Sequence, residues 1–548
     1  MRTRTTVGAA RRLVFASVML TSTTLSANAA PLLSNHVPMI VREHAVEAVG
    51  LPDPASHLQL SIALPMRNPA ALDDTLHSIY DPSSPQYRHY LSLEEFTRRF
   101  GPAEINYQKA LDFFEANGLH VTASSANRYI IDVDGPVSAI DRVFHLTLRL
   151  YRHPVENRDF VAPDREPTVD LDVPLLHVTG LDDYILPMPR LVPPEAHAGS
   201  ARFTGSGPHG YFLGSDMRAA YYGGTLKGTG QSVGLMELVG YNPSDIDLYF
   251  KTVKQTLSVP VTGVATDGST PLTCTSCDDS EQVLDAEYAI SMAPGLSELK
   301  IYVSKHPVSI LNAMATDTSV LQFSTSWGWQ ENFAAEDPIY KEMGVQGQTF
   351  LTASGDNSSL KASGPWPEED ANITGVGGTD LVTNGAGGTY KSETGWKDSA
   401  GGPSLDKSIT IPTWQEAFIN ASNKGSHTLR NVPDVAANAN FNMYICATFS
   451  ATKKGKCEGG WGGTSFASPM WAGFIALANE QAATNGKPKI GFLAPTMYGL
   501  AGGTSYHTVL HDVVGGKSGL YTAVKGYDLV TGVGSPRGSA LIDALANQ

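Results

Sequence analysis

Polar and apolar side chains alternate in the first third of the chain in a way that predicts short strands and helices. Strand-like alternation occurs at 58–62 and 129–133, and helical periodicity occurs at 68–80 and 103–117. Elements that follow one another in this order fit a ferredoxin-like α/β arrangement. The pattern therefore predicts a compact module within residues 58–153.

The hydrophobic pattern differs in the later part of the chain. Short apolar runs at 232–236, 299–303 and 349–353 alternate with helical stretches at 280–292 and 465–478. Parallel strands need long crossover connections, which are usually helices. The alternation therefore predicts a mainly parallel sheet with helices on its faces, so that the fold class is α/β in both parts.

Residues 187–210 separate the two patterns and have no periodicity of their own. Pro, Gly, Ala and Ser predominate there, together with Arg190 and Arg202. This composition is typical of exposed chain, so the segment is interpreted as a cleavable linker. A chain of 548 residues is also longer than one hydrophobic core usually supports, which favours at least two domains.

The N-terminus has the features of a secretory signal peptide. Arginines within the first 12 residues precede an apolar run at 13–20 and an Ala27-Asn28-Ala29 cleavage signal. That run is too short to span a bilayer, and no later segment reaches the roughly 18 apolar residues that a membrane helix needs. We therefore expect a secreted, extracellular protein that has no membrane partner.

Charge and cysteine content narrow the class further. The net charge of −15 would repel the phosphates of a nucleic acid, so no nucleic-acid partner is expected. The four cysteines of an exported chain can form two disulfides in three connectivities. Cys446 with Cys457 would close a short loop, and Cys274-x-x-Cys277 favours a local disulfide over zinc because no histidine lies nearby.

A glycine-rich turn at 459–463 leads into a predicted helix of small residues that begins at Ser465. Unpaired N–H groups and the helix dipole at that position suit an activated oxygen and a developing oxyanion. Pro469 would be tolerated as a residue of the first turn. Taken alone, the pattern fits a nucleophilic serine and a simple helix cap equally well.

Two carboxyls offer a base in place of histidine. The chain has 15 histidines but no histidine motif ahead of Ser465. Glu281 and Asp285 are four residues apart and share one face of a predicted helix, which Asp279 and Gln282 would cap. Such a pair favours a shared proton at acid pH, so that one carboxyl accepts a proton while the other orients it. The same spacing also occurs on solvated helix surfaces.

A third acid follows the apolar run at 349–353. Asp356, in Ser354-Gly355-Asp356, would lie at the carboxyl edge of a parallel sheet, where α/β proteins build their sites. When protonated, it could donate a hydrogen bond to a tetrahedral oxyanion. The alternative is a turn-forming aspartate after a glycine.

Together these motifs resemble the sedolisins, which are serine-carboxyl peptidases with a subtilisin-like catalytic domain, and among them precursors of the kumamolisin type. The matching blocks, in the family's order, are Glu281-x-x-x-Asp285, Ser354-Gly355-Asp356 and Gly463-Thr464-Ser465 with Pro469. The resemblance implies that Ser465 is the nucleophile and Glu281 the base, with Asp285 as its partner. Asp356 would be the oxyanion acid. Glu237 and Trp327 resemble residues that extend the carboxyl network in kumamolisin-like members.

The resemblance also covers the N-terminal module. The segments Asp81-Pro82-Ser83-Ser84-Pro85-Gln86-Tyr87 and Phe100-Gly101-Pro102 look like parts of the family's activation propeptide. The propeptide would inhibit the enzyme within the same chain. The expected order is a signal peptide at 1–29, an activation propeptide at 30–186, a cleavable linker at 187–210 and a peptidase domain at 211–548.

The C-terminal stretch 511–536 resembles the family's calcium loop, which implies one Ca²⁺ ion per chain. The ligands would be the side chains of Asp512 and Asp528 and the carbonyls of Val513, Val524 and Gly526. Hard oxygen donors of this kind suit calcium. Val524 stands where the family tends to have glycine, which matters little for a carbonyl ligand. A Gly- and Asp-rich turn without metal is the alternative.

The expected function is that of a secreted serine-type endopeptidase that hydrolyses peptide bonds in proteins and peptides at acid pH and processes its own precursor. A subtilisin-type serine peptidase and a catalytically inactive secreted homologue are the alternatives. The missing histidine motif argues against the subtilisin type. Intact acids at all three motif positions argue against an inactive homologue.

Overall fold

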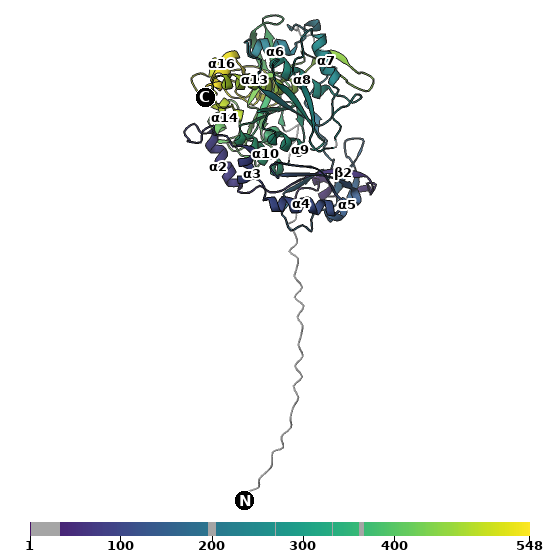
Figure 1. The fold of residues 1–548 in the computed structure, drawn as a ribbon. Coiled ribbons are helices and arrows are strands. Elements are labelled where there is room, and N and C mark those ends of the chain that lie inside the picture. The colour runs from purple at the N-terminus through teal and green to yellow at the C-terminus, as the bar shows by residue number, and fades with distance from the viewer. Residues whose placement is uncertain (2–32, 195–203, 269, 331, 361–366) are drawn as a thin grey trace.

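The computed structural model describes residue 1 and residues 33–194, 204–268, 270–330, 332–360 and 367–548. Apart from Met1, the predicted signal peptide lies outside these residues, and so does the middle of the predicted linker. Within the described part, no helix is both long and apolar enough to cross a membrane. Figure 1 shows two domains, one coloured purple to blue and the other teal to yellow.

The N-terminal domain contains a four-stranded antiparallel sheet in the order β3-β4-β2-β7. Helices α2, α3 and α4 lie between β2 and β3 in the chain, and α5 follows β4, which fits the predicted ferredoxin-like arrangement. A second sheet pairs β1, β5 and β6. The elements are α1 (Met39–Arg42), β1 (Ala48–Gly50), β2 (His57–Ala63), α2 (Pro69–Tyr80), α3 (Leu93–Arg99), α4 (Glu104–Ala116), β3 (His120–Ser124), β4 (Ile130–Pro136), α5 (Val137–Val143), β5 (Leu148–Arg152), β6 (Asp159–Pro163) and β7 (His177–Thr179).

The larger domain is built on one sheet in the order β10-β11-β9-β12-β14-β15-β16, with β19 also paired to β15. Every pair is parallel except β15 with β16, as predicted for a subtilisin-like domain. The elements up to β19 are β8 (Met188–Pro189), α6 (Gly214–Tyr221), β9 (Ser232–Glu237), α7 (Pro243–Thr252), β10 (Val261–Ala265), α8 (Ser280–Met292), β11 (Glu298–Val303), α9 (Pro307–Thr316), β12 (Gln322–Thr325), β13 (Trp327–Gly328), α10 (Phe333–Gln346), β14 (Thr349–Ala353), η3 (Pro367–Glu369), β15 (Thr374–Thr383), β16 (Tyr390–Gly395), β17 (Gly402–Pro403), α12 (Thr413–Glu416), β18 (Asn431–Val432) and β19 (Val435–Asn438).

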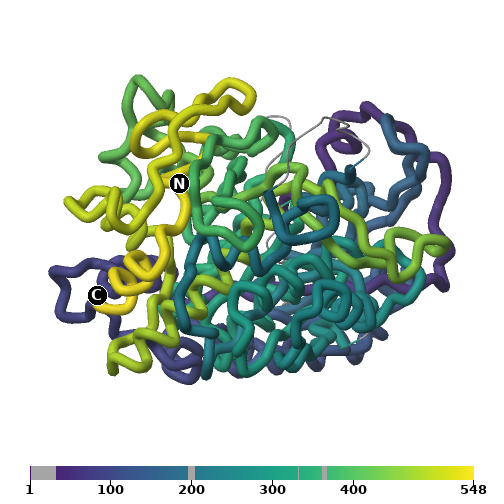
Figure 2. Tube along the Cα trace, turned by 90° about the horizontal axis from the view of Figure 1, so that it is seen from above, coloured from purple at the N-terminus to yellow at the C-terminus, as the bar shows by residue number. Residues whose placement is uncertain are grey.

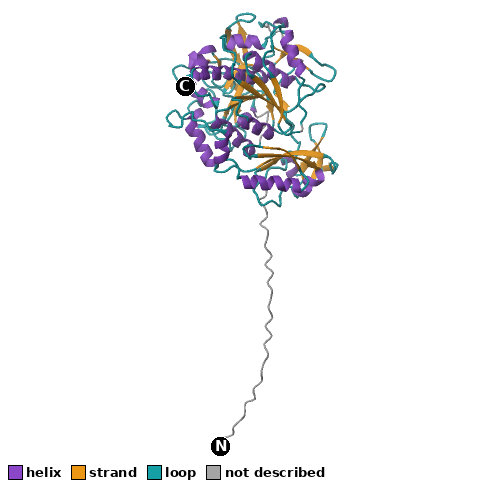
Figure 3. Cartoon of the chain, in the orientation of Figure 1, coloured by secondary structure: helices purple, strands orange, loops and turns teal. Residues whose placement is uncertain are grey.

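The remaining elements complete the helical layers around this sheet. They are β20 (Met443–Ala447), β21 (Lys456–Trp461), α13 (Thr464–Thr484), α14 (Leu493–Ala501), α15 (Tyr506–Val509), β22 (Leu510–His511), β23 (Lys517–Ser518), β24 (Tyr521–Thr522), β25 (Ser535–Pro536) and α16 (Gly538–Ala546). Figure 3 shows the large sheet between helices, with the smaller sheet of the N-terminal domain below it. Helices α8 and α13 pack closely, since a Cβ at Gly473 of α13 would lie only 2.8 Å from the Ala289 carbonyl oxygen of α8.

The N-terminal domain is docked on helices α9 and α10 of the larger domain (Figure 1). Side chains alternate between the faces of a strand, so Leu60 and Ile62 pack in the domain's own core, whereas Ala63 joins side chains of α9 and α10. The Tyr129 hydroxyl donates to the Ala335 carbonyl at 2.9 Å, and Asn127 Nδ2 donates to Glu342 Oε2 at 2.7 Å.

The C-terminal part of the chain gathers on one side of the molecule, where Figure 2 shows it in yellow. The end of the chain lies beside the N-terminal domain there. Arg88 Nη1 donates to the carbonyl of Gln548 at 3.1 Å. The first and last parts of the described chain are therefore in direct contact.

Candidate active site

The parallel sheet directs three strand ends toward one place. Glu237 is the last residue of β9, Ser326 follows β12, and Asp356 follows β14 by three residues. Strands β9 and β12 are neighbours from which the chain continues in opposite directions along the sheet. Such a switch point at the carboxyl ends of strands is where α/β folds form their sites.

Helix α8 carries the predicted acid pair inside the protein, not on its surface. Every residue of this helix is buried, and Glu281 and Asp285 are 2% and 0% exposed. Neighbouring elements cover it on all sides, including α13, α6, α7 and β20. The reading of this pair as a solvated surface feature therefore does not hold.

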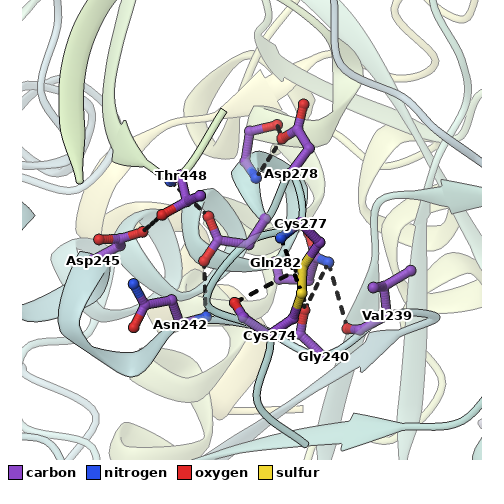
Figure 4. Close-up of a disulfide and its surroundings, with 11 residues drawn as sticks. Val239, Gly240, Asn242, Asp245, Cys274, Cys277, Asp278, Gln282 and Thr448 are labelled. Atoms are coloured by element: carbon purple, nitrogen blue, oxygen red, sulfur yellow. Dashed lines mark hydrogen bonds between the residues drawn. A yellow bond between two sulfur atoms is a disulfide. The ribbon is translucent and has the colours of Figure 1, made fainter. Parts of the chain in front are cut away.

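The start of α8 is held by the loop before it, which Figure 4 shows around the Cys274–Cys277 disulfide. Asp279 is the residue that precedes the first turn of α8, as predicted, but its side chain makes no capping hydrogen bond. Its carboxylate instead accepts from the N–H groups of Asn242 and Thr448, both at 2.8 Å. The Asp279 carboxylate thus links its own segment to two other segments of the chain. Because these N–H groups use the carboxylate oxygens, the side chain does not cap the helix.

The other disulfide joins Cys446 to Cys457 across the β20–β21 hairpin. Strand β21 leads directly into the glycine-rich turn before Ser465. Among the three connectivities that the sequence allows, the structure thus contains the two local pairs.

Three buried carboxyls form a row that starts beside Ser465. Glu281 lies nearest to the serine, and Asp285 lies between Glu281 and Glu237. The Ser326 hydroxyl donates to Asp285 Oδ1 at 2.6 Å, and Trp327 Nε1 donates to Glu237 Oε2 at 2.8 Å. The structure therefore brings together five of the residues predicted from separate segments of sequence, and adds Ser326.

Burial sets the protonation of this row. Loss of solvent raises the pKa of Glu281 well above its usual range, the neighbouring Asp285 raises it further, and the Ser465 hydroxyl opposes the shift. Burial likewise raises the pKa values of Asp285 and Glu237. Carboxyls this close cannot all be ionised, so the row retains protons under conditions in which exposed acids have lost theirs.

Ser465 is the second residue of α13 and is fully buried. Pro469 was predicted to lie in the first turn of this helix, but α13 begins at Thr464, which places the proline in the second turn. A proline there cannot donate to the carbonyl four residues earlier, which belongs to Ser465. The Ser326 hydroxyl donates to that carbonyl instead, at 3.1 Å.

Asp356 is tied to the start of α13. Its Oδ1 accepts from the Thr464 N–H at 2.7 Å and from the Thr464 hydroxyl at 2.9 Å. Its Oδ2 is buried and accepts no hydrogen bond from the described residues. Burial raises the pKa of Asp356 to about 7, while the hydrogen bonds from Thr464 and the charge of Arg190 lower it. This carboxyl can therefore hold a proton on an oxygen that no other group occupies.

The beginning of the predicted linker passes through the site. Although the segment was expected to be exposed, Arg190 is only 2% exposed, because its backbone and side chain are both enclosed by the larger domain. The Ser465 N–H donates to the Arg190 carbonyl oxygen at 3.2 Å, and the Ser465 hydroxyl also contacts that oxygen. Arg190 Nη2 lies 3.2 Å from Glu368 Oε1.

No histidine among the described residues makes a hydrogen bond or ion pair with Ser465 or with the row of carboxyls. The titratable side chain beside Ser465 is therefore the carboxyl of Glu281.

The predicted calcium ligands lie together in the C-terminal loop. The N–H of Gly526 donates to Asp512 Oδ1 at 2.9 Å, and the N–H of Val524 donates to Asp528 Oδ2 at 3.1 Å. The Asp528 carboxyl is 0% exposed, and burial raises its pKa to about 7. The carbonyls of Val513, Val524 and Gly526 accept no hydrogen bond from the described backbone.

These features fit a hard cation, because a buried carboxylate without a positive partner is costly and a bound ion would offset that cost. Among the described residues, Asp528 makes no ion pair, and Asp512 pairs only with the His507 imidazole, at 3.9 Å. A calcium site in this loop would use two carboxylates, and its other ligands would be backbone carbonyls. In the described ranges, no cluster of three His, Cys, Asp or Glu side chains suited to a metal occurs.

Two family models match the chain, one in each domain. The description "Pro-kumamolisin, activation domain" matches residues 45–184, and "Subtilase family" matches residues 285–493. Kumamolisin of Bacillus sp. (strain MN-32) is 29% identical over 510 residues, which cover 84% of this chain and 87% of that protein. Sedolisin of Pseudomonas sp. (strain 101) is 26% identical over 519 residues, covering 86% and 84%.

A solved structure of Pseudomonas sedolisin, described as a serine-carboxyl proteinase, is similar in fold. Its TM-score is 0.53 at 24% identity, and the match covers 64% of this chain and 100% of that one. Fold and site thus define a subtilisin-like protein in which a buried serine is surrounded by carboxyl groups. The chain is a sedolisin-family peptidase precursor, with a pro-kumamolisin activation domain followed by a subtilase-type peptidase domain.

Three site residues were not predicted from the sequence. Ser326, which precedes the predicted Trp327, links Asp285 to the Ser465 carbonyl. Thr464 donates two hydrogen bonds to Asp356, and its place in the Gly463-Thr464-Ser465 motif does not predict this contact. Glu368 lies in the acidic stretch 368–370, where nothing in the pattern marks one acid as a partner of Arg190.

Proposed function

We propose that this protein is an exported endopeptidase precursor that hydrolyses peptide bonds at acid pH, with Ser465 as the nucleophile. Glu281 accepts the Ser465 proton, and Asp285 and Glu237 hold Glu281 in a shared-proton network. Asp356, when protonated, donates to the oxyanion of the tetrahedral intermediate. Glu281 then returns the proton to the leaving amine, and water hydrolyses the acyl-enzyme.

The observation that supports this proposal best is the gathering of four carboxyls around a buried serine at a helix N-terminus. The Ser465 N–H faces a peptide carbonyl, as an oxyanion donor must. The free Oδ2 of Asp356 supplies a second donor when it is protonated. A subtilisin-type mechanism would need a histidine in contact with Ser465, which the described residues do not supply.

Maturation would begin with cleavage inside residues 187–210 and separate the propeptide at 30–186 from the peptidase domain at 211–548. Until then the propeptide chain occupies the site and inhibits the enzyme within its own chain. Support comes from Arg190, which lies against the nucleophile while the domain before it is docked on α9 and α10.

We further propose that one calcium ion binds at Asp512 and Asp528, with the carbonyls of Val513, Val524 and Gly526. A bound Ca²⁺ would supply the positive charge that the buried Asp528 lacks and would hold loop 511–536 on the domain. The expected extracellular location rests on the sequence signal at 1–29.

Acidification of the purified full-length protein tests the proposed activity. The wild type should cleave itself near pH 4, increasingly slowly as pH rises through about 7, and stay intact in alkaline solution, because Asp356 donates only when protonated. The variants Ser465→Ala and Glu281→Ala should remain full length. Replacing the histidines singly by Gln should leave kcat within about tenfold in folded variants. Efficient self-cleavage by Ser465→Ala, or a wild-type optimum in alkali, would contradict the proposal.

A further inference from the structure

We propose that Arg190–Leu191 is the first bond that the enzyme cuts in its own precursor, and that Glu368 makes the adjoining pocket selective for arginine. The residue whose carbonyl is attacked is called the acyl-side residue here, and its pocket the acyl-side pocket. The inference rests on the proposed function and adds to it the scissile bond and a substrate class.

The backbone on both sides of this bond is held in an extended conformation. Before the bond, β8 pairs with β13 in antiparallel register, and the Arg190 N–H donates to the Ser326 carbonyl at 2.8 Å. After the bond, Val192 and Gly462 exchange N–H to carbonyl hydrogen bonds at 2.8 and 3.2 Å. The segments of the enzyme at β13 and at Gly462 therefore hold the chain by backbone hydrogen bonds before and after this bond. The Arg190 carbonyl lies between these two sets of hydrogen bonds.

The carbonyl of Arg190 lies where the proposed mechanism needs it. Its oxygen contacts the Ser465 hydroxyl and accepts from the Ser465 N–H. Gly463, with a φ of 138°, leaves the space beside it open. A Cβ at that position would clash with the Arg190 carbonyl oxygen and lie 2.9 Å from Asp356 Oδ2, so both groups border the same small space.

The Arg190 side chain fills a closed pocket with an acid at its end. Arg190 and Glu368 are 2% and 0% exposed as side chains, and Nη2 lies 3.2 Å from Oε1. Two glycines make room for the guanidinium. A Cβ at Gly328 would lie 2.5 to 2.6 Å from its atoms, and one at Gly355 would lie 3.0 Å from Nη1.

This pocket discriminates between side chains because a buried charge needs a partner. A neutral acyl-side residue would leave the buried Glu368 without its donor, and an acidic one would meet a like group. A carboxyl oxygen accepts a hydrogen bond from the guanidinium whether or not the carboxyl is ionised. Lysine should bind less well, since it lacks the planar fork that fits a carboxyl.

The chemical step is an acyl transfer within the chain. Ser465 Oγ bonds to the Arg190 carbonyl carbon as its proton passes to Glu281. The bond from that carbon to the Leu191 nitrogen breaks, and the nitrogen receives the proton. Water then hydrolyses the ester, which leaves a carboxylate on Arg190 and restores the Ser465 hydroxyl. In other proteins the same pocket should select bonds that follow arginine.

The position of the first cut is tested on the full-length precursor. After acidification, intact-mass spectrometry over time should show the earliest fragments ending at Arg190 and beginning at Leu191. Arg190→Ala should slow this cut at least about tenfold, and Arg190→Lys should slow it less. Arg202→Ala, in the same linker, is the matched control and should not change it. An earliest wild-type cut at another bond would overturn the proposal, and so would an unchanged rate in Arg190→Ala.

Selectivity is tested separately on the mature enzyme. Quenched peptides with the sequence Met-Pro-X-Leu-Val-Pro would carry arginine, its neutral isostere citrulline or alanine at X. Wild-type kcat/KM should favour arginine by about ten- to hundredfold. Glu368→Gln should reduce that ratio to a few-fold, whereas Glu369→Gln, whose carboxyl accepts from Ser404, should keep it. Gly328→Ala should lower the arginine rate more than the rate for alanine at X.

The outcomes separate this inference from the function on which it rests. Hydrolysis of denatured protein that depends on Ser465 but shows no preference for arginine would defeat the pocket assignment alone. An unchanged ratio in Glu368→Gln would do the same. Absence of any Ser465-dependent hydrolysis would defeat the proposed function, and the inference with it.

Discussion

Asp356 shows at the scale of one residue how an environment changes what a side chain can do. An exposed aspartate loses its proton near pH 4, whereas burial raises the pKa of Asp356 to about 7. Thr464 occupies one carboxyl oxygen through two hydrogen bonds and leaves the other free. The result is an acid that can act as a hydrogen-bond donor in the range where most acids only accept.

The first prediction concerns this proton. Activity should fall as pH rises through about 7, because the donor form of Asp356 exists below its pKa and disappears above it. Asp356→Ala should lose about a hundredfold or more in kcat/KM at pH 4. Asp356→Asn keeps a donor at every pH, so it should lose less and decline less on the alkaline side. Kinetics from pH 3 to 8 on the mature variants measure this, and a steeper alkaline decline in Asp356→Asn than in the wild type would contradict it.

At the scale of elements, helix α13 lacks one of its backbone hydrogen bonds, and a side chain from the segment after β12 replaces it. Pro469 leaves the Ser465 carbonyl without the usual donor, and the single O–H of Ser326 is shared between that carbonyl and Asp285. One side chain at the end of β12 thus positions both the nucleophile's helix and the carboxyl row. The strand and the helix are separated by 139 positions in the chain.

The second prediction tests this link. Ser326→Ala should cost about 1–3 kcal/mol of stability, because it removes the donor to two buried acceptors. Pro469→Ala supplies a backbone N–H that can reach the Ser465 carbonyl, so the double variant should recover part of the loss. Chemical denaturation of the four forms in a Ser465→Ala background gives the coupling. Strictly additive losses would show that Ser326 and Pro469 act independently.

The C-terminal loop is a second element that local structure alone does not explain. Asp528 is buried among backbone N–H groups of its own loop, and no cation offsets its charge within the described residues. Asp512 joins the loop from the end of β22.

The third prediction therefore concerns metal removal. A chelator should lower the Tm of the mature protein, because a ligand that binds only the folded state stabilises it. Asp528→Asn and Asp512→Asn should lower the Tm and lose most of the response to chelator. Asp543→Asn, an exposed position on α16, should respond as the wild type does. An unchanged Tm together with no calcium in elemental analysis would contradict the site.

At the scale of the whole molecule, buried acids recur well beyond the catalytic site. Burial raises the pKa values of Asp132 to about 7 and of Glu342 to about 8 where the two domains meet. It does the same for Glu336 and Glu368, both to about 8. Three histidines oppose this trend, since burial lowers the pKa values of His306 and His511 to about 4 and that of His177 well below its usual range, but the raised acids are more numerous.

The fourth prediction follows from the sign of these shifts. An acid whose folded pKa is raised contributes stability that is fully present below its unfolded value near 4 and is lost as pH rises through the folded value. The Ser465→Ala precursor should therefore be most stable in mildly acid solution, with a Tm at pH 8 about 5 °C or more below that at pH 5. Calorimetry between pH 4 and 8 measures this. A Tm that rises steadily toward pH 8 would contradict it.

Much of the fold could be predicted from periodicity, because strands and amphipathic helices bury local faces. The helix over 280–292 and the strand over 349–353 agree with α8 and β14, and the sheet is mainly parallel as expected. The capping hydrogen bond expected from Asp279 is absent, and the placement of Pro469 in the first turn was wrong. In both cases a distant segment, at Thr448 or Ser326, takes over a hydrogen bond that the local pattern assigned to the helix itself.

The sequence by itself determined which segments form strands and helices and which motifs carry a serine and carboxyls in a recognisable order. Only the tertiary structure decided that α8 is wholly buried, that three carboxyls form a row, and that Arg190 reaches Glu368 across 178 positions. The physical reason is that a pattern of residues reports the preferences of a local segment, whereas burial and pairing depend on what the rest of the chain places against it.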